Sequence, residues 1–193
     1  MEENRFVLRN ARAIAEDYIR RSVLPGDHVI DATMGNGGDT EMLCRLVGET
    51  GKVDAFDVQE QAVESTRTRL ERAGLSDRAV LHCMGHEKME QAVTGPVQAV
   101  LFNFGWLPGG DHSVTTKVET TLQAVRAALR LICRGGIVSL CIYPGHEEGH
   151  RELEALLQFC AGLPVREYNV LHHHFLNAAD YTPNLILIQK NLV

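Results

Sequence analysis

Three glycines, Gly35, Gly37 and Gly38, lie in a short run that begins with Asp31. Glycine has no Cβ, so its backbone takes positive φ easily and lets a ligand approach closely. The run follows an apolar segment and precedes one with helical character, which is the strand, turn and helix arrangement that cradles nucleotides. A second apolar segment closes on Asp57, whose carboxylate is placed to bind two ribose hydroxyls.

The spacing of the glycines narrows the class of ligand. The dinucleotide fingerprint G-x-G-x-x-G, started at Gly35, needs glycine at position 40, where the chain has Thr40. A Walker phosphate loop needs a lysine, which the turn lacks. A ligand with adenine and ribose but no phosphate fits better, and S-adenosylmethionine is such a ligand. The start Asp-x-x-x-Gly-x-Gly resembles the first motif of Rossmann-like methyltransferases, with Thr33 where many of them have another glycine.

Polar and aromatic residues follow a further apolar segment, residues 97–101. Because ligands of open α/β sheets lie beyond the carboxyl ends of the strands, we expect Asn103 beside the cofactor. Methyltransferases that act on exocyclic amines carry Asn or Asp, two prolines and an aromatic residue at this place. Here Asn103 and Trp106 keep the polar and aromatic ends, and Phe104-Gly105 replaces the prolines. Trp106 is either a core aromatic or a ring that stacks on a base, and its place after Asn103 favours stacking.

The alternating periodicities predict an α/β fold. Strands are expected at residues 28–32, 53–57, 79–83, 97–103 and 136–142, with helices between them at 38–47, 59–73, 114–131 and 149–160. This alternation indicates a parallel sheet with helices on both faces. Two more strands, at 165–171 and 185–188, form a hairpin, so the last strand is antiparallel. We therefore expect one domain over residues 1–193, with the seven-stranded Rossmann-like sheet of class I methyltransferases and an amphipathic N-terminal helix at about 5–23.

The composition fits a folded cytoplasmic enzyme. The chain has 193 residues, of which 45% are hydrophobic, enough for one sizeable core. Its five cysteines include no C-x-x-C pair and indicate reduced thiols. The N-terminal part has no continuous apolar run, so we expect no membrane span. The net charge of −6 gives no global positive field, but an RNA substrate requires only that the contacting face be basic.

Residues 146–150 read His-Glu-Glu-Gly-His and fit H-E-x-x-H, the zinc protease signature. That motif works only when both histidines project from one face of a continuous helix. Pro144 and Gly145 before it, and Gly149 within it, argue against such a helix. We therefore expect a loop and no metal site, which leaves a zinc hydrolase as a remote alternative. The better hypothesis is that His146 lines the substrate pocket.

Several motifs together resemble one family of small bacterial methyltransferases, long described as rRNA methylases. The motifs are residues 31–37, Asp39-Thr40, Phe56-Asp57-Val58-Gln59, the stretch from Asn103 to Asp111, and Tyr143-x-Gly145-His146-x-x-Gly149. The run Leu107-Pro108-Gly109-Gly110-Asp111 is the most specific of them. The family includes enzymes that methylate the 5-aminomethyl group of the wobble uridine, often 2-thiolated, in tRNA. The segment at 172–183 matches the family only loosely. Its three histidines, residues 172–174, are interpreted as a solvated loop rather than as a site.

The resemblance implies a set of site residues and a partner. The implied cofactor contacts are Asp31, Thr33, Gly35, Asn36, Gly37, Asp39, Thr40, Asp57, Gln59, Asn103 and Gly105. His86 either edges the adenine site or is a surface histidine. The expected catalytic residues are Asn103, Trp106, Asp111 and His112, the last two chosen because they lie close to Asn103 in the sequence. The partner is the anticodon arm of tRNA, and a homodimer is common for small enzymes of this kind.

The expected reaction transfers a methyl group from S-adenosylmethionine to a primary amine. Such an amine resembles lysine and is mostly protonated at neutral pH, so the pocket must favour the neutral form. We expect the Asn103 side-chain oxygen to accept the amine hydrogens, and Asp111 or His112 to take the departing proton. An rRNA methyltransferase acting on cytosine N4 and a small-molecule amine methyltransferase are the alternatives. His28 and His82, within or beside strands, are expected to be structural.

Overall fold

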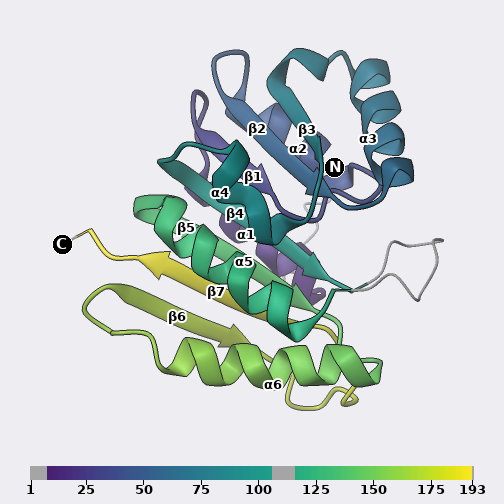
Figure 1. Ribbon diagram of the computed structural model, residues 1–193. Helices are drawn as coiled ribbons and strands as arrows, with labels where there is room; N and C mark the ends of the chain where they lie inside the picture. Colours follow the sequence, from purple (N-terminus) through teal and green to yellow (C-terminus); the bar gives the residue numbers. More distant parts are fainter. Residues whose placement is uncertain (1–7, 106–115, 193) are drawn as a thin grey trace, which may run out of the picture.

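The computed structural model describes residues 8–105 and 116–192, and its centre is a seven-stranded sheet in the order β3-β2-β1-β4-β5-β7-β6 (Figure 1). The strands are β1 His28–Asp31, β2 Lys52–Asp57, β3 Ala79–Cys83, β4 Val97–Phe104, β5 Ile132–Ile142, β6 Tyr168–His173 and β7 Asn184–Lys190. Neighbouring strands among β1 to β5 pair in parallel, whereas β7 is antiparallel to both β5 and β6. The predicted fold class and the antiparallel last strand are confirmed.

Helices cover both faces of this sheet. They are α1 Ala11–Ser22, α2 Gly38–Val47, α3 Glu60–Ala73, α4 Met89–Ala92, α5 Val118–Leu131 and α6 Glu147–Ala161, with short 3-10 turns at Ser76–Arg78 and His86–Lys88. Figure 1 shows α5 and α6 in front of the sheet and α1 and α2 behind it. The apolar residues of α4, α5 and α6 join one buried cluster, and those of α1, α2 and α3 join another. Within the described residues, no helix is both long and apolar enough to span a bilayer.

The central strands are buried on both sides, which explains why they read as continuous apolar runs. In β4, Val100 and Phe102 face the cluster under α5, whereas Ala99 and Leu101 face the cluster under α1 and α2. Successive side chains of a strand point to opposite faces, so a strand between two helical layers needs apolar residues at every position. The polar residues that end these strands therefore mark the edge of the sheet at which chemistry can occur.

Several boundaries differ from the prediction, and two of them have a clear physical reason. Helix α1 begins at Ala11 rather than at about residue 5, because the Asn10 side chain accepts a hydrogen bond from Ala13 N at 2.9 Å and caps it there. Strand β5 begins at Ile132 rather than at residue 136, since Gly135 with φ of 78° lets the strand continue through an irregular register. The four-residue α4 and the 3-10 turns are too short to show a periodicity.

Candidate functional site

The glycine turn lies between the carboxyl ends of β1 and β2. Gly35 and Gly37 have φ values of 50° and 77°, which residues with a Cβ adopt poorly. A Cβ on Gly37 would lie only 2.8 Å from Thr66 Oγ1, so α3 packs directly on the turn. The Thr66 hydroxyl donates to Gly35 O at 3.0 Å and fixes this arrangement. The turn therefore presents backbone, rather than side chains, at the place where a ligand would enter.

Asp31 is buried completely at the end of β1. Its carboxylate accepts hydrogen bonds from the Thr40 hydroxyl at 2.6 Å and from Thr33 N at 3.2 Å. Burial, together with the nearby charge of Asp39, raises the pKa of Asp31 to about 7. Thr40 is itself fully buried, so its contribution to a ligand site would be to hold Asp31.

Asp57 ends β2 and joins two backbone segments. One carboxylate oxygen accepts from Gly35 N at 3.1 Å, and the other accepts from Gln59 N at 3.0 Å. Each oxygen has a further lone pair, so the partly buried carboxylate could still accept hydrogen bonds from two hydroxyls. Gln59 contributes its backbone here and is the N-terminal cap residue of α3.

Asn103, near the end of β4, is held at two points. Its backbone N–H donates to the Thr33 hydroxyl at 2.8 Å, and its side-chain Nδ2 donates to Asp39 Oδ2 at 2.8 Å. The other oxygen of Asp39 accepts from the Arg12 guanidinium, through Nε at 3.2 Å and also through Nη2. This ion pair raises the pKa of Arg12. Asp39 thus links the N-terminal helix to β4. Arg12 is not among the site residues predicted from the sequence.

His86 lies against the aromatic end of β4. Its ring meets Phe102 and Phe104 edge-on, with centroids 5.7 and 6.1 Å apart. Its Nδ1 lies 3.2 Å from Ala32 O, which requires Nδ1 to carry a proton and to donate. Burial lowers the pKa of His86 and favours the neutral ring. Of the two interpretations left open, a packed position at the edge of the site fits this geometry better than a surface position.

Trp106, Asp111 and His112 lie outside the described residues. The residues that border that segment, Gly105 and Thr116, are hydrogen bonded to each other, from Thr116 N to Gly105 O at 3.3 Å.

Two carboxylates of α6 hold the chain just after this segment. Glu152 is fully buried and accepts from the hydroxyls of Thr116 at 2.9 Å and Thr121 at 2.5 Å. Glu148 accepts from Val118 N at 3.0 Å, which satisfies a free N–H at the start of α5. Sequence reasoning missed both residues, because they act on partners about thirty positions away.

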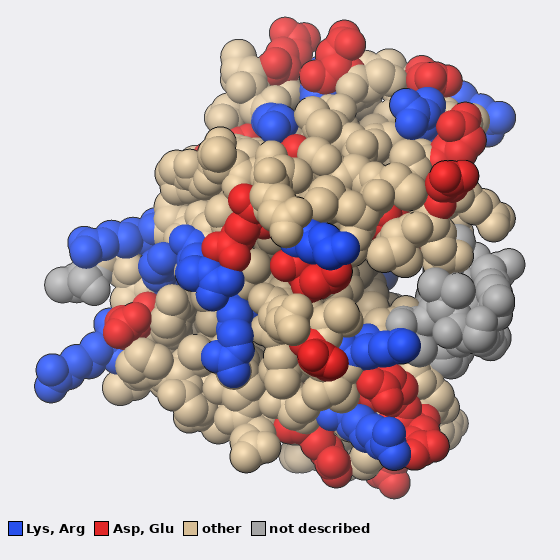
Figure 2. All heavy atoms as spheres, viewed as in Figure 1, with Lys and Arg blue, Asp and Glu red and all other residues tan. Residues whose placement is uncertain are grey.

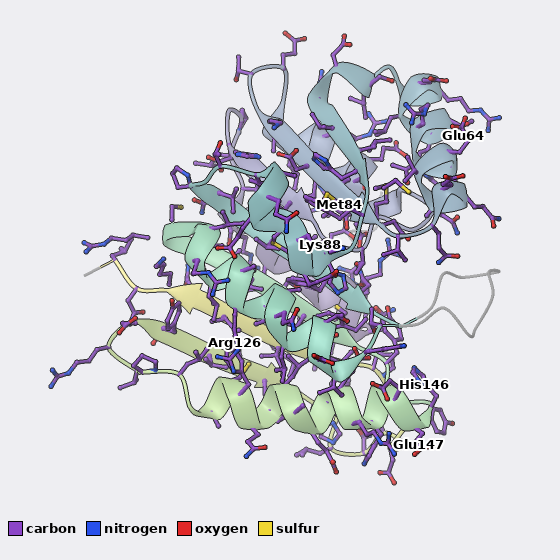
Figure 3. The ribbon with its side chains drawn as sticks, viewed as in Figure 1. Glu64, Met84, Lys88, Arg126, His146 and Glu147 are labelled. Carbon is purple, nitrogen blue, oxygen red and sulfur yellow. The ribbon has the colours of Figure 1, made fainter. Side chains whose placement is uncertain are left out.

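The expectation of a loop at the His-Glu-Glu-Gly-His motif is wrong, because helix α6 begins at Glu147. His146 is its N-terminal cap, and its Nδ1 accepts a hydrogen bond from Gly149 N at 3.1 Å. The cap compensates for the poor helix propensity of Gly149, and Pro144 lies outside the helix. Figure 3 shows His146 and Glu147 at the beginning of α6. Within the described part of the chain, no three His, Cys, Asp or Glu side chains are grouped to hold a metal ion.

An open groove of about 510 Å³ lies beyond the end of β5. It is lined by Pro144, Gly145, His146, Glu147, His150, Arg151, Asp180 and Tyr181. Tyr181, which is 72% exposed, is the aromatic ring of this groove. Because Asn103 in β4 is paired with Cys141 in β5, the groove lies on the same edge of the sheet as the glycine turn. His146 lines this groove, and its role in a substrate pocket stays a prediction.

Interpreting the three consecutive histidines as a solvated loop is wrong for two of them, because His172 and His173 belong to β6. His172 and His174 both contact Asn184 Oδ1, at 2.8 and 3.2 Å, while His173 contacts the Tyr18 hydroxyl at 3.3 Å. These partners fasten β6 to β7 on one side and to α1 on the other. The alternation of contacts is that of a strand, in which neighbouring side chains point to opposite faces.

His28 and His82 both contact a carboxylate that sequence reasoning missed. Asp54 is fully buried in β2, and its two oxygens lie 2.6 Å from His28 Nε2 and 2.7 Å from His82 Nε2. Lys52 Nζ lies 2.9 Å from the same carboxylate. Burial alone would raise the pKa of Asp54, but these partners outweigh it and lower the value to about 2. The cluster joins β1, β2 and β3, which agrees with the structural role expected of both histidines.

The sheet order, the glycine turn after β1 and the carboxylate that ends β2 together define a class I methyltransferase. The family model described as "Putative rRNA methylase" matches residues 53–189. The chain therefore belongs to the putative rRNA methylase family. It is an S-adenosylmethionine-dependent methyltransferase, and the cradle of glycines with Asp57 at its edge fits that cofactor.

Similar proteins span nearly the whole chain. A tRNA (mnm(5)s(2)U34)-methyltransferase of Arabidopsis thaliana chloroplasts is 38% identical over 195 residues, covering 96% of this chain and 71% of the relative. A solved structure described as a putative rRNA-methylase, from Clostridium thermocellum, is 42% identical, covers 94% of this chain and 98% of that chain, and has a TM-score of 0.93. A putative methyltransferase from Streptococcus mutans, solved in complex with SAH, is 34% identical, with coverages of 94% and 98% and a TM-score of 0.86.

Proposed function

We propose that this enzyme methylates the primary amine of 5-aminomethyl-uridine, 2-thiolated or not, at the wobble position of tRNA, and yields 5-methylaminomethyl-uridine. The observation that carries the proposal is the orientation of Asn103. One of its two Nδ2 hydrogens is donated to Asp39 Oδ2, which fixes the amide and leaves its oxygen available as an acceptor for a substrate. An oxygen acceptor suits an amine, whose hydrogens it can bind. The similarity to the chloroplast tRNA methyltransferase supports the same substrate class.

The residues of the chain would bind and orient the reactants. When bound, S-adenosylmethionine supplies an activated methyl group on a positively charged sulfur. We propose that Asp57 binds the ribose hydroxyls, the turn containing Gly35, Asn36 and Gly37 accommodates the nucleoside, and Asp31 stabilises the positive charge of the cofactor. Asn103 Oδ1 accepts an amine hydrogen and directs the nitrogen lone pair, so catalysis is mainly alignment. Trp106, Asp111 and His112 keep their proposed roles in stacking on the base and taking the proton.

The surface electrostatics restrict how an RNA would be held. Figure 2 shows basic side chains intermixed with acidic ones on the face that α5 and α6 form. The chain as a whole carries a net charge of −6. A tRNA would therefore be bound through local contacts near the site rather than by a general attraction to phosphate. The groove that contains Tyr181 supplies an aromatic ring for such a contact.

The experiment is methylation of defined RNAs by the purified enzyme with S-adenosylmethionine, followed by nucleoside mass spectrometry. The tRNA that carries 5-aminomethyl-uridine should gain one methyl group, and the same tRNA with unmodified uridine should gain none. The rate should rise between about pH 6 and 8.5 and then level, because only the neutral amine reacts. Methylation of 16S rRNA or of a free amine in place of this tRNA would contradict the proposed substrate and leave the methyltransferase activity standing.

Asn103→Ala tests the residue that carries the proposal. The lost contact orients the nitrogen in the transition state, so turnover should fall by roughly a hundredfold or more while cofactor affinity changes little. Asn103→Asp is a second variant to compare with Asn103→Ala. It places another carboxylate beside Asp39, which would attract the protonated amine. An Asn103→Ala enzyme with normal turnover would remove Asn103 from the mechanism.

A further inference from the structure

We propose that Arg12 is a positioning residue for methyl transfer: by neutralising Asp39 it fixes the amide of Asn103 and keeps the substrate amine uncharged. The inference rests on the proposed function, because it concerns the amine that Asn103 is proposed to bind. Asp39 is the connecting group, since it accepts from Asn103 Nδ2 at 2.8 Å and from Arg12 Nε at 3.2 Å. Arg12 itself need not touch the substrate.

The first step concerns geometry. An Asn side chain can turn by 180° and exchange its oxygen and nitrogen, which would present N–H donors to the amine instead of an acceptor. Asp39 prevents this exchange, because a carboxylate accepts from Nδ2 and repels Oδ1. Arg12 in turn fixes Asp39 by two contacts to one of its oxygens, which leaves the other oxygen for Asn103. The orientation of Asn103 is therefore determined by a residue of α1.

The second step concerns charge. An opposite charge within about 4–6 Å favours the charged form of a titrating group by one or more pH units. An amine bound at Asn103 Oδ1 would lie near the Asp39 carboxylate, which by itself would keep it as the unreactive ammonium ion. The Arg12 cation offsets that carboxylate. The side chain of Asp39 is only 17% exposed, so water screens it poorly, whereas that of Arg12 is 56% exposed.

Other charged and titratable groups also surround this pair. The groups that interact with Arg12 or Asp39 are Glu16 on α1, Asp31 on β1, Cys141 at the end of β5 and Tyr143 just after it. Asp57, at the end of β2, acts on Asp31. Asp31 already interacts with Asp39 electrostatically, so the edge of the sheet carries several carboxylates. Within the described residues, Arg12 is the cation that forms an ion pair with this carboxylate group.

The reaction requires the neutral amine because the nitrogen lone pair forms the new N–C bond as the carbon–sulfur bond breaks. The secondary ammonium product then loses one proton, which Asp111 or His112 is proposed to take. A residue that lowers the population of the ammonium substrate therefore raises the rate at neutral pH and has less effect at high pH. This pH dependence separates the proposed role from a merely structural one.

The experiment compares pH profiles of kcat at saturating substrate for Arg12→Met, Arg12→Lys, Asp39→Asn and the Arg12→Met/Asp39→Asn double variant. The acidic limb is the part of each profile in which kcat rises with pH. Arg12→Met should shift this lower limb to higher pH by about one unit, so that kcat at pH 7 falls roughly tenfold and returns to the wild-type value at high pH. Arg12→Lys keeps the charge and should keep the limb near its wild-type position. In the Asp39→Asn background, Arg12→Met should no longer move the limb upward.

Arg21→Met is the matched control, because Arg21 is an exposed arginine of α1 that does not belong to the Arg12–Asp39 ion pair. This control variant should leave the pH profile of kcat unchanged. In Arg12→Met, the affinity for the cofactor should change less than twofold. An equal loss at every pH in Arg12→Met, or the same upward shift with and without Asp39, would overturn the inference. If the wild-type enzyme methylates another amine instead of tRNA, the proposed function fails, while the same profiles on that amine still decide the role of Arg12.

Discussion

The Glu152 carboxylate on α6 lies 2.9 Å from the Thr116 hydroxyl, and Thr116 directly follows the segment of residues 106–115. Thr116 also donates its backbone N–H to Gly105 O, at 3.3 Å. A single short stretch is therefore tied both to β4, which carries Asn103, and to a buried carboxylate on a different helix. The first turns of α6, which contain the residues that fit the zinc protease signature, therefore help to hold the chain next to β4 in place.

We expect Glu152→Ala to destabilise the enzyme by about 1–3 kcal/mol, because the buried hydroxyl of Thr121 and the partly buried hydroxyl of Thr116 lose their acceptor. Turnover should fall more than cofactor affinity, since the affected chain borders the proposed catalytic residues. Urea unfolding and steady-state kinetics measure the two effects. Glu152→Gln keeps one oxygen acceptor and should be milder, and equal losses in both variants would contradict this explanation.

Replacing Asp57 with Ala should weaken S-adenosylmethionine binding by roughly tenfold to a hundredfold, which corresponds to about 1.5–3 kcal/mol for hydrogen bonds to a charged group. The variant also loses the acceptor for Gly35 N and Gln59 N, so the turn itself becomes less fixed. Calorimetric titration measures the affinity. Glu60→Ala, at an exposed carboxylate in the first turn of α3, is the control. Unchanged binding in Asp57→Ala would remove Asp57 from the cofactor site.

The raised pKa of Asp31 predicts a pH dependence of stability. Its value of about 7 lies above the ordinary 3.8, so the folded chain binds more protons than the unfolded chain between these two values. The free energy of unfolding should therefore decrease as pH rises through this window, and this contribution should be constant above about pH 7. Thermal melts from pH 5 to 8 measure the trend. Asp31→Asn should flatten it, and an Asn variant with the wild-type slope would show that another group titrates.

Asp54 predicts the opposite behaviour in acid. Its pKa is lowered to about 2, so its contribution to stability is present above about pH 3.8 and is lost as pH falls toward 2. Asp54→Asn should reduce the free energy of unfolding by about 2 kcal/mol at neutral pH, and the difference from wild type should shrink in acid. Urea unfolding at several pH values measures it. Asp77→Asn, an exposed carboxylate beside β3, should have no comparable effect.

The sequence predicts the strands, and supports the proposed cofactor residues, because both are local patterns. A strand buried on two faces is a continuous apolar run, and Asp31 and Asp57 stand where such runs end. The contacts that orient the site are not local. Arg12 and Asp39 are 27 positions apart and Asn103 is 64 positions from Asp39, so only the packing of α1, α2 and β4 brings them together.

Predictions from the sequence are wrong where a helix cap or a strand pairing outweighs the local propensity of the residues. Gly149 disfavours a helix, and the run of three histidines suggests a polar loop. The cap by His146 and the pairing of β6 with β7 override these propensities.

The position of β7 has a consequence for synthesis on the ribosome. β7 follows β6 in the chain, yet it lies between β5 and β6 in the sheet. While the protein emerges, β1 to β5 can pair as they appear, but β6 has no neighbour until β7 has left the exit tunnel. A nascent chain arrested before Asn184 would expose the unpaired edge of β5, which is a template for aggregation. The sheet therefore keeps one open edge until the last of its seven strands has been made.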